Sequence, residues 1–244
     1  MTQSVNRIPW ADADGDIACN LAMGLMVQAL PQRLAIDGRL HAETYVSAAG
    51  VIAGYAAQRT LFGEMTPVPG ENIHLMTTRD GGKYWFGDAL NNLLLHRDNE
   101  DAPRRVWAMA AAGAMQAGLT EADLPVVGTL FSYVASSIGG ANEGRSSVPE
   151  KHQAHLPARD LLKAVWPFAL KCFNDPLPGA PPQIGKAPVA WWAAIAAQAA
   201  LKPIVDVQSV LEPRIALTLL MESAIYASKL DATLIGGELA SAVA

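Results

Sequence analysis

The pattern of apolar positions predicts a mainly helical chain with one especially apolar helix at its centre. This helix covers about residues 40–62, where small and apolar side chains face nearly every direction and no proline interrupts the run. A helix that is apolar all round is usually buried on several sides. Gly50 and Gly54 each cost about 1 kcal/mol relative to alanine in a helix interior. Because they lie four residues apart, we expect them to let another helix approach closely.

Shorter helices are predicted on both sides of this central one. Their approximate ranges are 17–30, 89–96, 103–117, 120–138, 158–173, 188–201 and 213–229. Proline cannot continue the hydrogen bonding of a helix. We therefore expect Pro31 to end the first of these helices, Pro167 to kink the fifth, and Pro203 to close the sixth.

The last predicted helix, 213–229, has an apolar and a polar side. Its expected core stripe consists of Leu217, Leu220, Met221, Ala224 and Ser228. The residues expected towards its polar side are Arg214, Thr218, Glu222 and Lys229. Tyr226 and Lys229 are one residue closer in sequence than the Tyr-x-x-x-Lys pair of short-chain dehydrogenases, and no glycine-rich strand-to-helix turn accompanies them. They are therefore not interpreted as that pair.

One β-hairpin is predicted at about residues 72–87. Apolar and polar residues alternate on both sides of Asp80-Gly81, a dipeptide that favours tight hairpin turns. A hairpin by itself is marginal in water unless it packs on helices or pairs with another strand. The hairpin is therefore a candidate dimer element. The predicted fold class is mainly α, an irregular multi-helix cluster around the central helix with this single hairpin.

The chain is predicted to form one α-rich domain, residues 1–244, with loosely ordered termini at 1–11 and 232–244. Its most obvious flexible loop is 139–156, and a second, proline-rich loop covers about 175–187. The composition is similar on both sides of these loops, which gives no reason to divide the chain.

Composition and charge narrow the possible partners and the compartment. Hydrophobic residues make up 51% and charged residues 17% of the chain, and no apolar run is long enough to span a membrane. We therefore expect a soluble homodimer. The net charge of −5 and the scattered basic residues argue against nucleic acid as a partner. Two cysteines and an acidic N-terminus without an apolar core suggest a reducing, bacterial-type cytoplasm.

The start of the central helix carries candidate ligand-binding residues. His41-Ala42-Glu43 matches the H-x-E part of zinc deaminases, but the only cysteine downstream is Cys172, so the P-C-x-x-C part is missing. Residues two apart on a helix do not share a face, whereas His41 and Tyr45 do. If a site lies near the core, we expect it to border this end of the helix. The candidate ligand-binding residues are His41, Glu43 and Tyr45; the simpler interpretation is an exposed helix start.

A second cluster, in the 139–156 loop, is the candidate metal site. Glu150, His152 and His155 supply three metal-ligand residue types within six positions. In a helical turn the two histidines point the same way, as metal binding needs. Pro149 and Pro157 limit the turn, and a solvated loop is the alternative interpretation.

These observations leave two functions open, and neither specifies catalytic residues or a cofactor. The first is a cytoplasmic, non-catalytic, homo-oligomeric protein that binds a protein partner or a small ligand. The second is a small metal-dependent hydrolase or lyase that uses a His/Glu site. The lack of a catalytic motif is weak support for the first, because active sites assemble in space. Whether His41 faces His152 or His155 across a pocket bears directly on the second.

Overall fold

A computed structural model describes residues 10–11, 15–63, 68–95, 105–176, 179 and 185–236 of the chain. These ranges contain eight α-helices and one two-stranded antiparallel hairpin, which confirms the predicted mainly α fold. The helices are α1 (Asp16–Leu34), α2 (Ala42–Phe62), α3 (Asp88–Leu95), α4 (Val106–Gln116), α5 (Val127–Ser137), α6 (Ala158–Asn174), α7 (Val189–Asp206) and α8 (Pro213–Lys229). The strands are β1 (His74–Thr77) and β2 (Lys83–Phe86). No helix in these ranges is long and apolar enough to cross a membrane.

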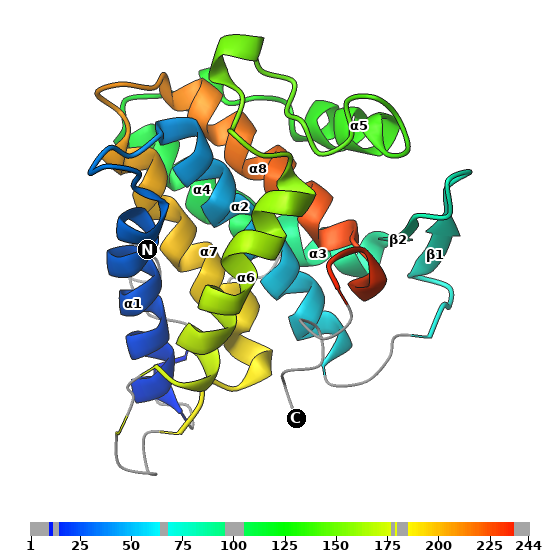
Figure 1. Ribbon diagram of the computed structural model, residues 1–244, viewed down its shortest axis with the longest axis horizontal. Coiled ribbons are helices and arrows are strands. Elements are labelled where there is room, and N and C mark those ends of the chain that lie inside the picture. Colours follow the sequence, from blue (N-terminus) through cyan, green and yellow to red (C-terminus); the bar gives the residue numbers. More distant parts are fainter. Residues whose placement is uncertain are drawn as a thin grey trace.

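Helix α2 is the centre of the fold, as its sequence predicts. Every residue from Thr44 to Arg59 is buried, and α7 and α8 pack along it (Figure 1). Gly50 and Gly54 face α8 so closely that a Cβ atom on either would overlap a backbone carbonyl oxygen, that of Leu220 or Ala224 respectively. The predicted close approach of a second helix is therefore confirmed, and α8 is that helix.

Two predicted helix ends are wrong, because α1 and α7 continue past a proline. Helix α1 contains Pro31 and runs to Leu34, and α7 contains Pro203 and runs to Asp206. Each proline lies in the last turns of its helix, where few hydrogen bonds remain to be disrupted. Burial of Pro203 and of the neighbouring Ile204 further favours continuation of α7.

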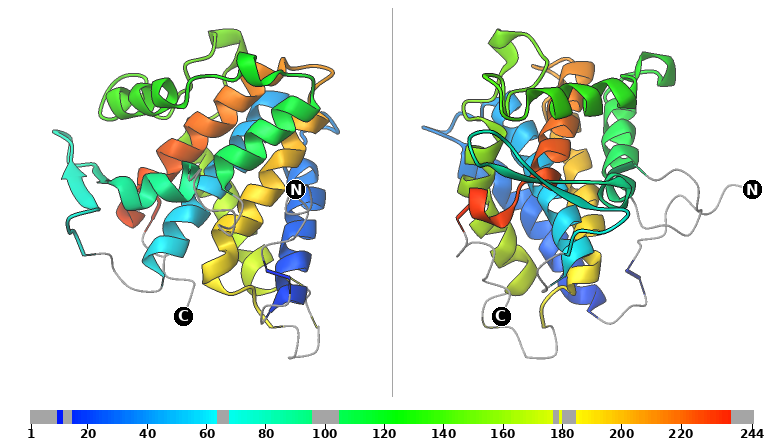
Figure 2. Two further views of the ribbon diagram at one scale, coloured as in Figure 1. Left: turned by 180° about the vertical axis from the view of Figure 1, so that it is seen from behind. Right: turned by 90° about the vertical axis from the view of Figure 1, so that its right-hand side faces the viewer.

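The helix predicted at 120–138 is divided at a proline. A short 3-10 turn, Glu121–Asp123, comes first, and α5 begins only at Val127. Leu124 is extended, with φ −60° and ψ 139°, because the ring of Pro125 disfavours helical backbone in the residue before it. The break turns α5 across the outer face of α8 (Figure 2).

Helix α8 has the predicted bounds and core stripe, but two of its polar residues are not where the pattern places them. Glu222 is 2% exposed and Lys229 is 3% exposed, although both were expected towards a polar side. The reason is that α5, the hairpin and segment 139–156 cover this face of α8. The part of the polar stripe around Glu222 and Lys229 is therefore a buried contact surface, whereas Arg214 is exposed as expected.

The hairpin packs on the helices through β2. His74 pairs with Phe86 and Thr77 with Lys83, and Gly81 has the positive φ of 87° that the turn requires. On the side of β2 that faces away from β1, Tyr84 forms an isolated β-bridge with Leu230, the residue that follows α8. Within the described ranges β1 has no second strand partner, so its outer edge is free.

Some residues of the termini that were predicted to be loose are packed against the core. Trp10 is fully buried, and its indole nitrogen donates to Asn20 Oδ1 at 3.0 Å. Ile235 is also buried. Most of 1–11 and residues 237–244 lie outside the described residues.

Candidate functional site

Residues 139–156, predicted to be a flexible loop, form a strap held on the helices by three carboxylates. The first is the strap's own Glu143. Its Oε1 accepts hydrogen bonds from the hydroxyls of Tyr84 on β2 and Tyr226 on α8, both at 2.6 Å, and its Oε2 accepts from the backbone nitrogen of Gly139 at 2.7 Å. Burial raises the pKa of Glu143, but these hydrogen bonds outweigh it and lower the pKa below its usual value.

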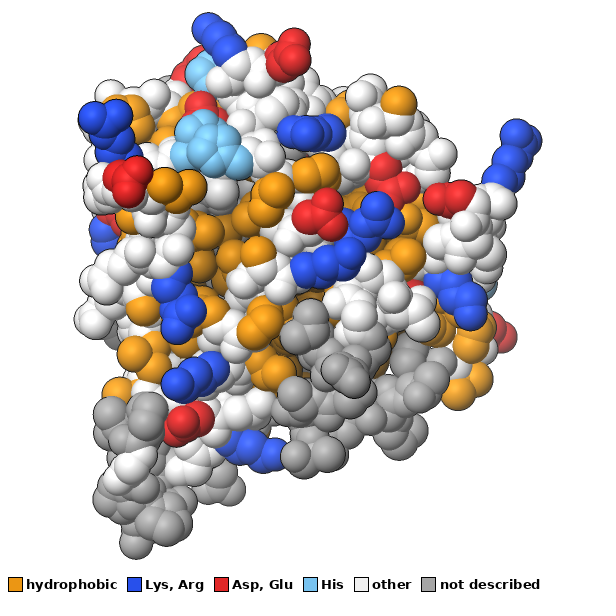
Figure 3. Space-filling model, in the orientation of Figure 1, with side chains coloured by type: hydrophobic (Ala, Val, Ile, Leu, Met, Phe, Trp, Pro, Cys, Tyr) orange, Lys and Arg blue, Asp and Glu red, His pale blue; other side chains and the backbone are white. Residues whose placement is uncertain are grey.

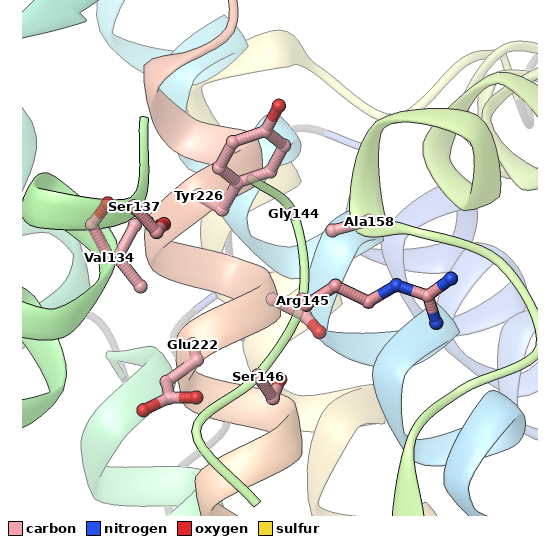
Figure 4. Close-up of a pocket in the computed structure, with 9 residues that line it drawn as sticks. Val134, Ser137, Gly144, Arg145, Ser146, Ala158, Glu222 and Tyr226 are labelled. Carbon is pink, nitrogen blue, oxygen red and sulfur yellow. Dashed lines mark hydrogen bonds between the residues drawn. The ribbon is translucent and has the colours of Figure 1, made fainter. Parts of the chain in front are cut away.

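The second carboxylate is the buried Glu222 of α8. It accepts from the backbone nitrogen of Ser147 at 2.6 Å and from the Ser147 hydroxyl at 2.7 Å. Figure 4 shows Glu222 and Tyr226 on α8 beside the strap, with the guanidinium of Arg145 directed away from Glu222. Burial raises the pKa of Glu222, and the hydrogen bonds from Ser147 only partly oppose the rise.

The third carboxylate, Glu43 of α2, lies between two histidines. Its Oε1 is 2.9 Å from His152 Nδ1, and its Oε2 is 3.3 Å from His41 Nε2. His155 stacks on His41 with ring centroids 3.8 Å apart. Segments about 110 residues apart in sequence therefore contribute three imidazoles and one carboxylate to a single His–Glu cluster: His41, Glu43, His152 and His155. Figure 3 shows histidine side chains gathered on one face of the molecule.

The position of His41 before the helix explains how it reaches Glu43. His41 is the N-cap of α2, with extended backbone angles of φ −80° and ψ 113°. The expectation that His41 and Glu43 cannot share a face is wrong, because it assumes that both are helical. The backbone nitrogen of Thr44 donates to His41 Nδ1 at 3.3 Å. Nδ1 is therefore the acceptor, and the hydrogen on Nε2 faces Glu43.

Thr44 joins this cap to the strap. Its Oγ1 lies 2.8 Å from His41 Nδ1 and accepts the backbone N–H of His155 at 3.0 Å. Because Nδ1 of His41 is an acceptor, the Thr44 hydroxyl donates to it. The start of α2 thus fixes both the tautomer of His41 and the backbone of the strap.

Burial and the neighbouring opposite charges shift the pKa values of His41 and Glu43 in opposite directions. Burial lowers the pKa of His41 most, the Glu43 carboxylate opposes this effect, and His155 adds to it. For Glu43, burial raises the pKa, but the hydrogen bond with His152 and the neighbouring imidazoles bring it below its usual value. These shifts favour the ionised form of Glu43 and the neutral form of His41.

Two predicted site residues lie elsewhere. Tyr45 is turned into the core, where its hydroxyl donates to Asp206 Oδ2 at 3.3 Å, and burial raises its pKa. Glu150 is exposed and lines a cavity on the other side of its turn. Among the described residues, no three His, Cys, Asp or Glu side chains are placed to hold a metal ion. The set Glu150, His152 and His155 is thus not preassembled, and its metal role stays a prediction.

A cavity of about 670 Å³ opens between α5 and the strap. Most of its lining side chains are polar: Tyr133, Asn142, Arg145, Ser146, Ser147, Glu150 and Gln153, with Ala141 and Val148 beside them. A neighbouring cleft over Glu222 and Tyr226 shares Arg145 and Ser146 with this cavity but has no room for a water molecule (Figure 4). The wall that the two spaces share is therefore closely packed.

The sequence interpretation missed Glu143 and Glu222, the two other carboxylates that hold the strap, and it missed the burial of Lys229. Glu222, Tyr226 and Lys229 recur at helical spacing on one side of α8, and this regularity was the available signal. The sequence pattern places Glu222 and Lys229 towards a polar side, because nothing in it shows what covers that side. Family models, curated proteins and solved structures were all compared with the chain, and none of them matches it.

Proposed function

We propose that this protein is a non-catalytic binding protein that holds a small polar ligand in the cavity between α5 and the strap. The size and lining of this cavity carry the proposal. Its volume of about 670 Å³ lies within the range of roughly 300–1,000 Å³ that is usual for small-molecule sites. It also places several hydrogen-bonding side chains around one space.

The lining favours a ligand that both donates and accepts hydrogen bonds. Arg145 only donates, and the Glu150 carboxylate only accepts. Asn142 carries both functions on the same wall. A compact metabolite that has both a negative and a positive group fits this set, because each charged wall residue then meets an opposite charge.

The strap gives the cavity a fixed frame. The amide of Gln153 donates to the carbonyl oxygens of Ser146 at 2.7 Å and Val148 at 2.9 Å, so this lining residue is held before any ligand arrives. Ser147 is held in turn by Glu222. A preformed site spends less of its binding free energy on ordering side chains.

A thermal-shift screen with free amino acids, sugars and nucleosides tests the proposal. A ligand present at 100 times its Kd adds about 2.7 kcal/mol to the unfolding free energy, which raises the Tm of a domain of this size by roughly 5–10 °C. Filling the cavity with Ala141→Trp is expected to abolish the shift. Ala135→Trp is the matched control, because Ala135 is an exposed residue of α5 outside the lining. Equal shifts in both variants, or no shift with any probe in the wild type, would contradict the proposal.

The His–Glu cluster favours a second candidate, a small metal-dependent hydrolase or lyase. Its specific support is that His41 meets His155 and, through Glu43, His152. Glu43 orients His152 through Nδ1, as carboxylates do for catalytic or metal-bound imidazoles. Elemental analysis of purified protein, together with melting curves in Zn²⁺ and Mn²⁺, tests this candidate. Absence of bound metal and an unchanged Tm would count against it.

We also propose that two copies associate in a reducing cytoplasm. The free outer edge of β1 supports the first part, since an unpaired strand edge can pair with another strand. Cys19 and Cys172 support the second, because both are buried free thiols and burial raises their pKa values to about 11 and about 12. Light scattering that finds only monomer at micromolar concentration would exclude the dimer.

A further inference from the structure

Alternate residues of β1 direct their backbone N–H and C=O groups away from β2. The backbone nitrogen of Thr78 donates to the carbonyl oxygen of Gly82, on the β2 side of the hairpin, at 2.8 Å. In an antiparallel pair, successive residues point these groups to opposite sides. Met76 therefore bonds to β2, whereas the backbone groups of Leu75 and Thr77 face outward.

Both ends of this outward-facing row are closed. Before β1, Ile73 exchanges two backbone hydrogen bonds with Gly70, at 2.8 Å and 3.3 Å. After β1, the carbonyl oxygen of Thr78 accepts from the backbone nitrogen of Gly81 at 3.0 Å and so closes the hairpin turn. In the described ranges, the open part of the edge consists of four groups, the N–H and C=O of Leu75 and of Thr77.

The side chains of β1 do not protect this edge from another strand. Natural edge strands are commonly guarded by charged side chains or proline. The strand His74–Thr77 has no Lys, Arg, Asp, Glu or Pro, and Met76, between the two open residues, is 56% exposed. The hairpin also lies at an extremity of the molecule, with β1 on its outer side (Figures 1 and 2). A second strand can therefore approach without meeting the helices.

We infer that β1 pairs antiparallel with β1 of a second copy, in the register that places Met76 opposite the partner's Met76. In this register Leu75 of each copy faces the partner's Thr77, so all four open groups of each copy form hydrogen bonds. A register shifted by two residues places Thr77 opposite Ile73, whose groups are already bonded, or Leu75 opposite Arg79 in the turn. A shift by one residue opposes outward-facing to inward-facing groups.

Charge at the two ends of the edge also favours an antiparallel copy. Glu71 precedes β1 and Arg79 follows it. The two-fold pairing brings the end with Glu71 beside the end with the partner's Arg79, whereas parallel copies would bring like charges together. The contact rests on the association of two copies proposed above and specifies how they meet. It does not depend on the ligand of the cavity.

Disulfide cross-linking of the full-length protein tests the register. The Cα atoms of a non-hydrogen-bonded antiparallel pair are about 4.5 Å apart, within the range of about 4.4–6.8 Å that a disulfide spans. Met76→Cys is therefore expected to give a disulfide-linked dimer with oxidised glutathione. His74→Cys, also exposed on β1, is the matched control, because the two copies of residue 74 lie about 13 Å apart. Cys19 and Cys172 are buried and do not compete.

A proline substitution tests the hydrogen bonds. Thr77→Pro removes an N–H that faces the partner and leaves the bonds between β1 and β2 in place, as proline on a strand edge can. By symmetry two intermolecular bonds are lost, so we expect the dimer Kd to rise about tenfold or more, with an unchanged Tm. Thr77→Val keeps the N–H and should keep the Kd. Light scattering over a concentration series measures both variants.

Four results would overturn this contact. A dimeric protein in which Met76→Cys does not cross-link has its interface elsewhere, and the association of two copies then stands without this register. Equal cross-linking of His74→Cys excludes the register, and an unchanged Kd in Thr77→Pro excludes the strand pairing. A wild type that stays monomeric at micromolar concentration overturns the contact together with the proposed dimer.

Discussion

Replacing Gly54 with leucine is expected to remove most of the stability of this protein. At this position a Cβ atom overlaps the carbonyl oxygen of Ala224 and lies 2.6 Å and 2.7 Å from the carbonyl carbon and Cα of that residue. These atoms belong to the backbone of α8, so they cannot rotate away as a side chain does. Helices α2 and α8 must move apart, and the buried contact between them must be rebuilt.

The expected loss of stability in Gly54→Leu follows from the contact between α2 and α8 that is disrupted when the two helices move apart. Overpacking of a core costs about 1–3 kcal/mol when neighbouring side chains can adjust, and more when backbone must move. We expect a loss of at least about 4 kcal/mol, a large share of the usual total of 5–15 kcal/mol. Urea unfolding followed by circular dichroism measures it, and Gly54→Ala should show a smaller loss in the same direction.

Gly24→Ala is the matched control for the Gly54 substitution. Gly24 lies inside α1, and a Cβ atom there meets nothing within 4 Å. Alanine is expected to add about 0.5–1 kcal/mol, because it lowers the entropy of the unfolded chain without a clash. An unchanged unfolding free energy in Gly54→Leu would show that α2 is not the centre of the core.

Replacing Lys229 with methionine is expected to stabilise the protein at neutral pH. The Lys229 side chain is buried at the end of α8, with its Nζ 3.4 Å from Asn91 Oδ1 and 4.7 Å from the centre of the Phe86 ring. In the described ranges no carboxylate forms a salt bridge with it. Burial lowers its pKa from 10.5 to about 8. Since one pKa unit corresponds to about 1.4 kcal/mol, the buried charge costs roughly 3 kcal/mol.

The way the unfolding free energy changes with pH shows why the substitution is expected to stabilise the protein. Below pH 8 the lysine is charged in both states, and the full cost lowers the unfolding free energy. Between pH 8 and 10.5 the unfolded chain binds more protons than the folded one, so the stability of the wild type rises with pH. Methionine cannot titrate, and Lys229→Met is therefore expected to gain about 1–3 kcal/mol at pH 7 and to lose this rise.

Chemical unfolding at pH 7, 8.5 and 10 measures both parts of the Lys229 prediction. Lys163→Met provides the control, because Lys163 is exposed and its salt bridge among the described residues is with the exposed Asp160. Its effect should stay within about 0.5 kcal/mol at every pH. Destabilisation by Lys229→Met would mean that the buried ammonium is a net favourable element of the fold, for example through its contacts with Phe86 and Phe131.

The sequence predicts the helices well where periodicity and packing agree. The bounds of α8 match, and the spacing of Gly50 and Gly54 predicts the close approach of a helix without identifying it. The prolines were over-weighted: one missing N–H near a helix end costs little, and at Pro203 burial of the proline and of Ile204 also favours continuation of the helix. Helical periodicity also cannot say which face of α8 is covered, since a buried polar stripe and a solvated one have the same spacing.

The candidate site was predicted in part and for partly wrong reasons. His41, Glu43, His152 and His155 were chosen from two separate motifs, and the structure brings them together. The contact between His41 and Glu43 depends on the N-cap backbone, which helix geometry alone does not describe. The cavity depends on α5 and the strap folding over α8. Such a contact between distant segments leaves no local pattern to find.

The strap and the helical core are held by different forces and should respond to different solvents. The core is held by buried apolar surface and by backbone contact between α2 and α8, which urea weakens in proportion to the surface exposed on unfolding. The strap is held by hydrogen bonds to the carboxylates of Glu43, Glu143 and Glu222. Protonation of these carboxyl groups weakens the hydrogen bonds that they accept, so we expect acid to loosen the strap more readily than the apolar core.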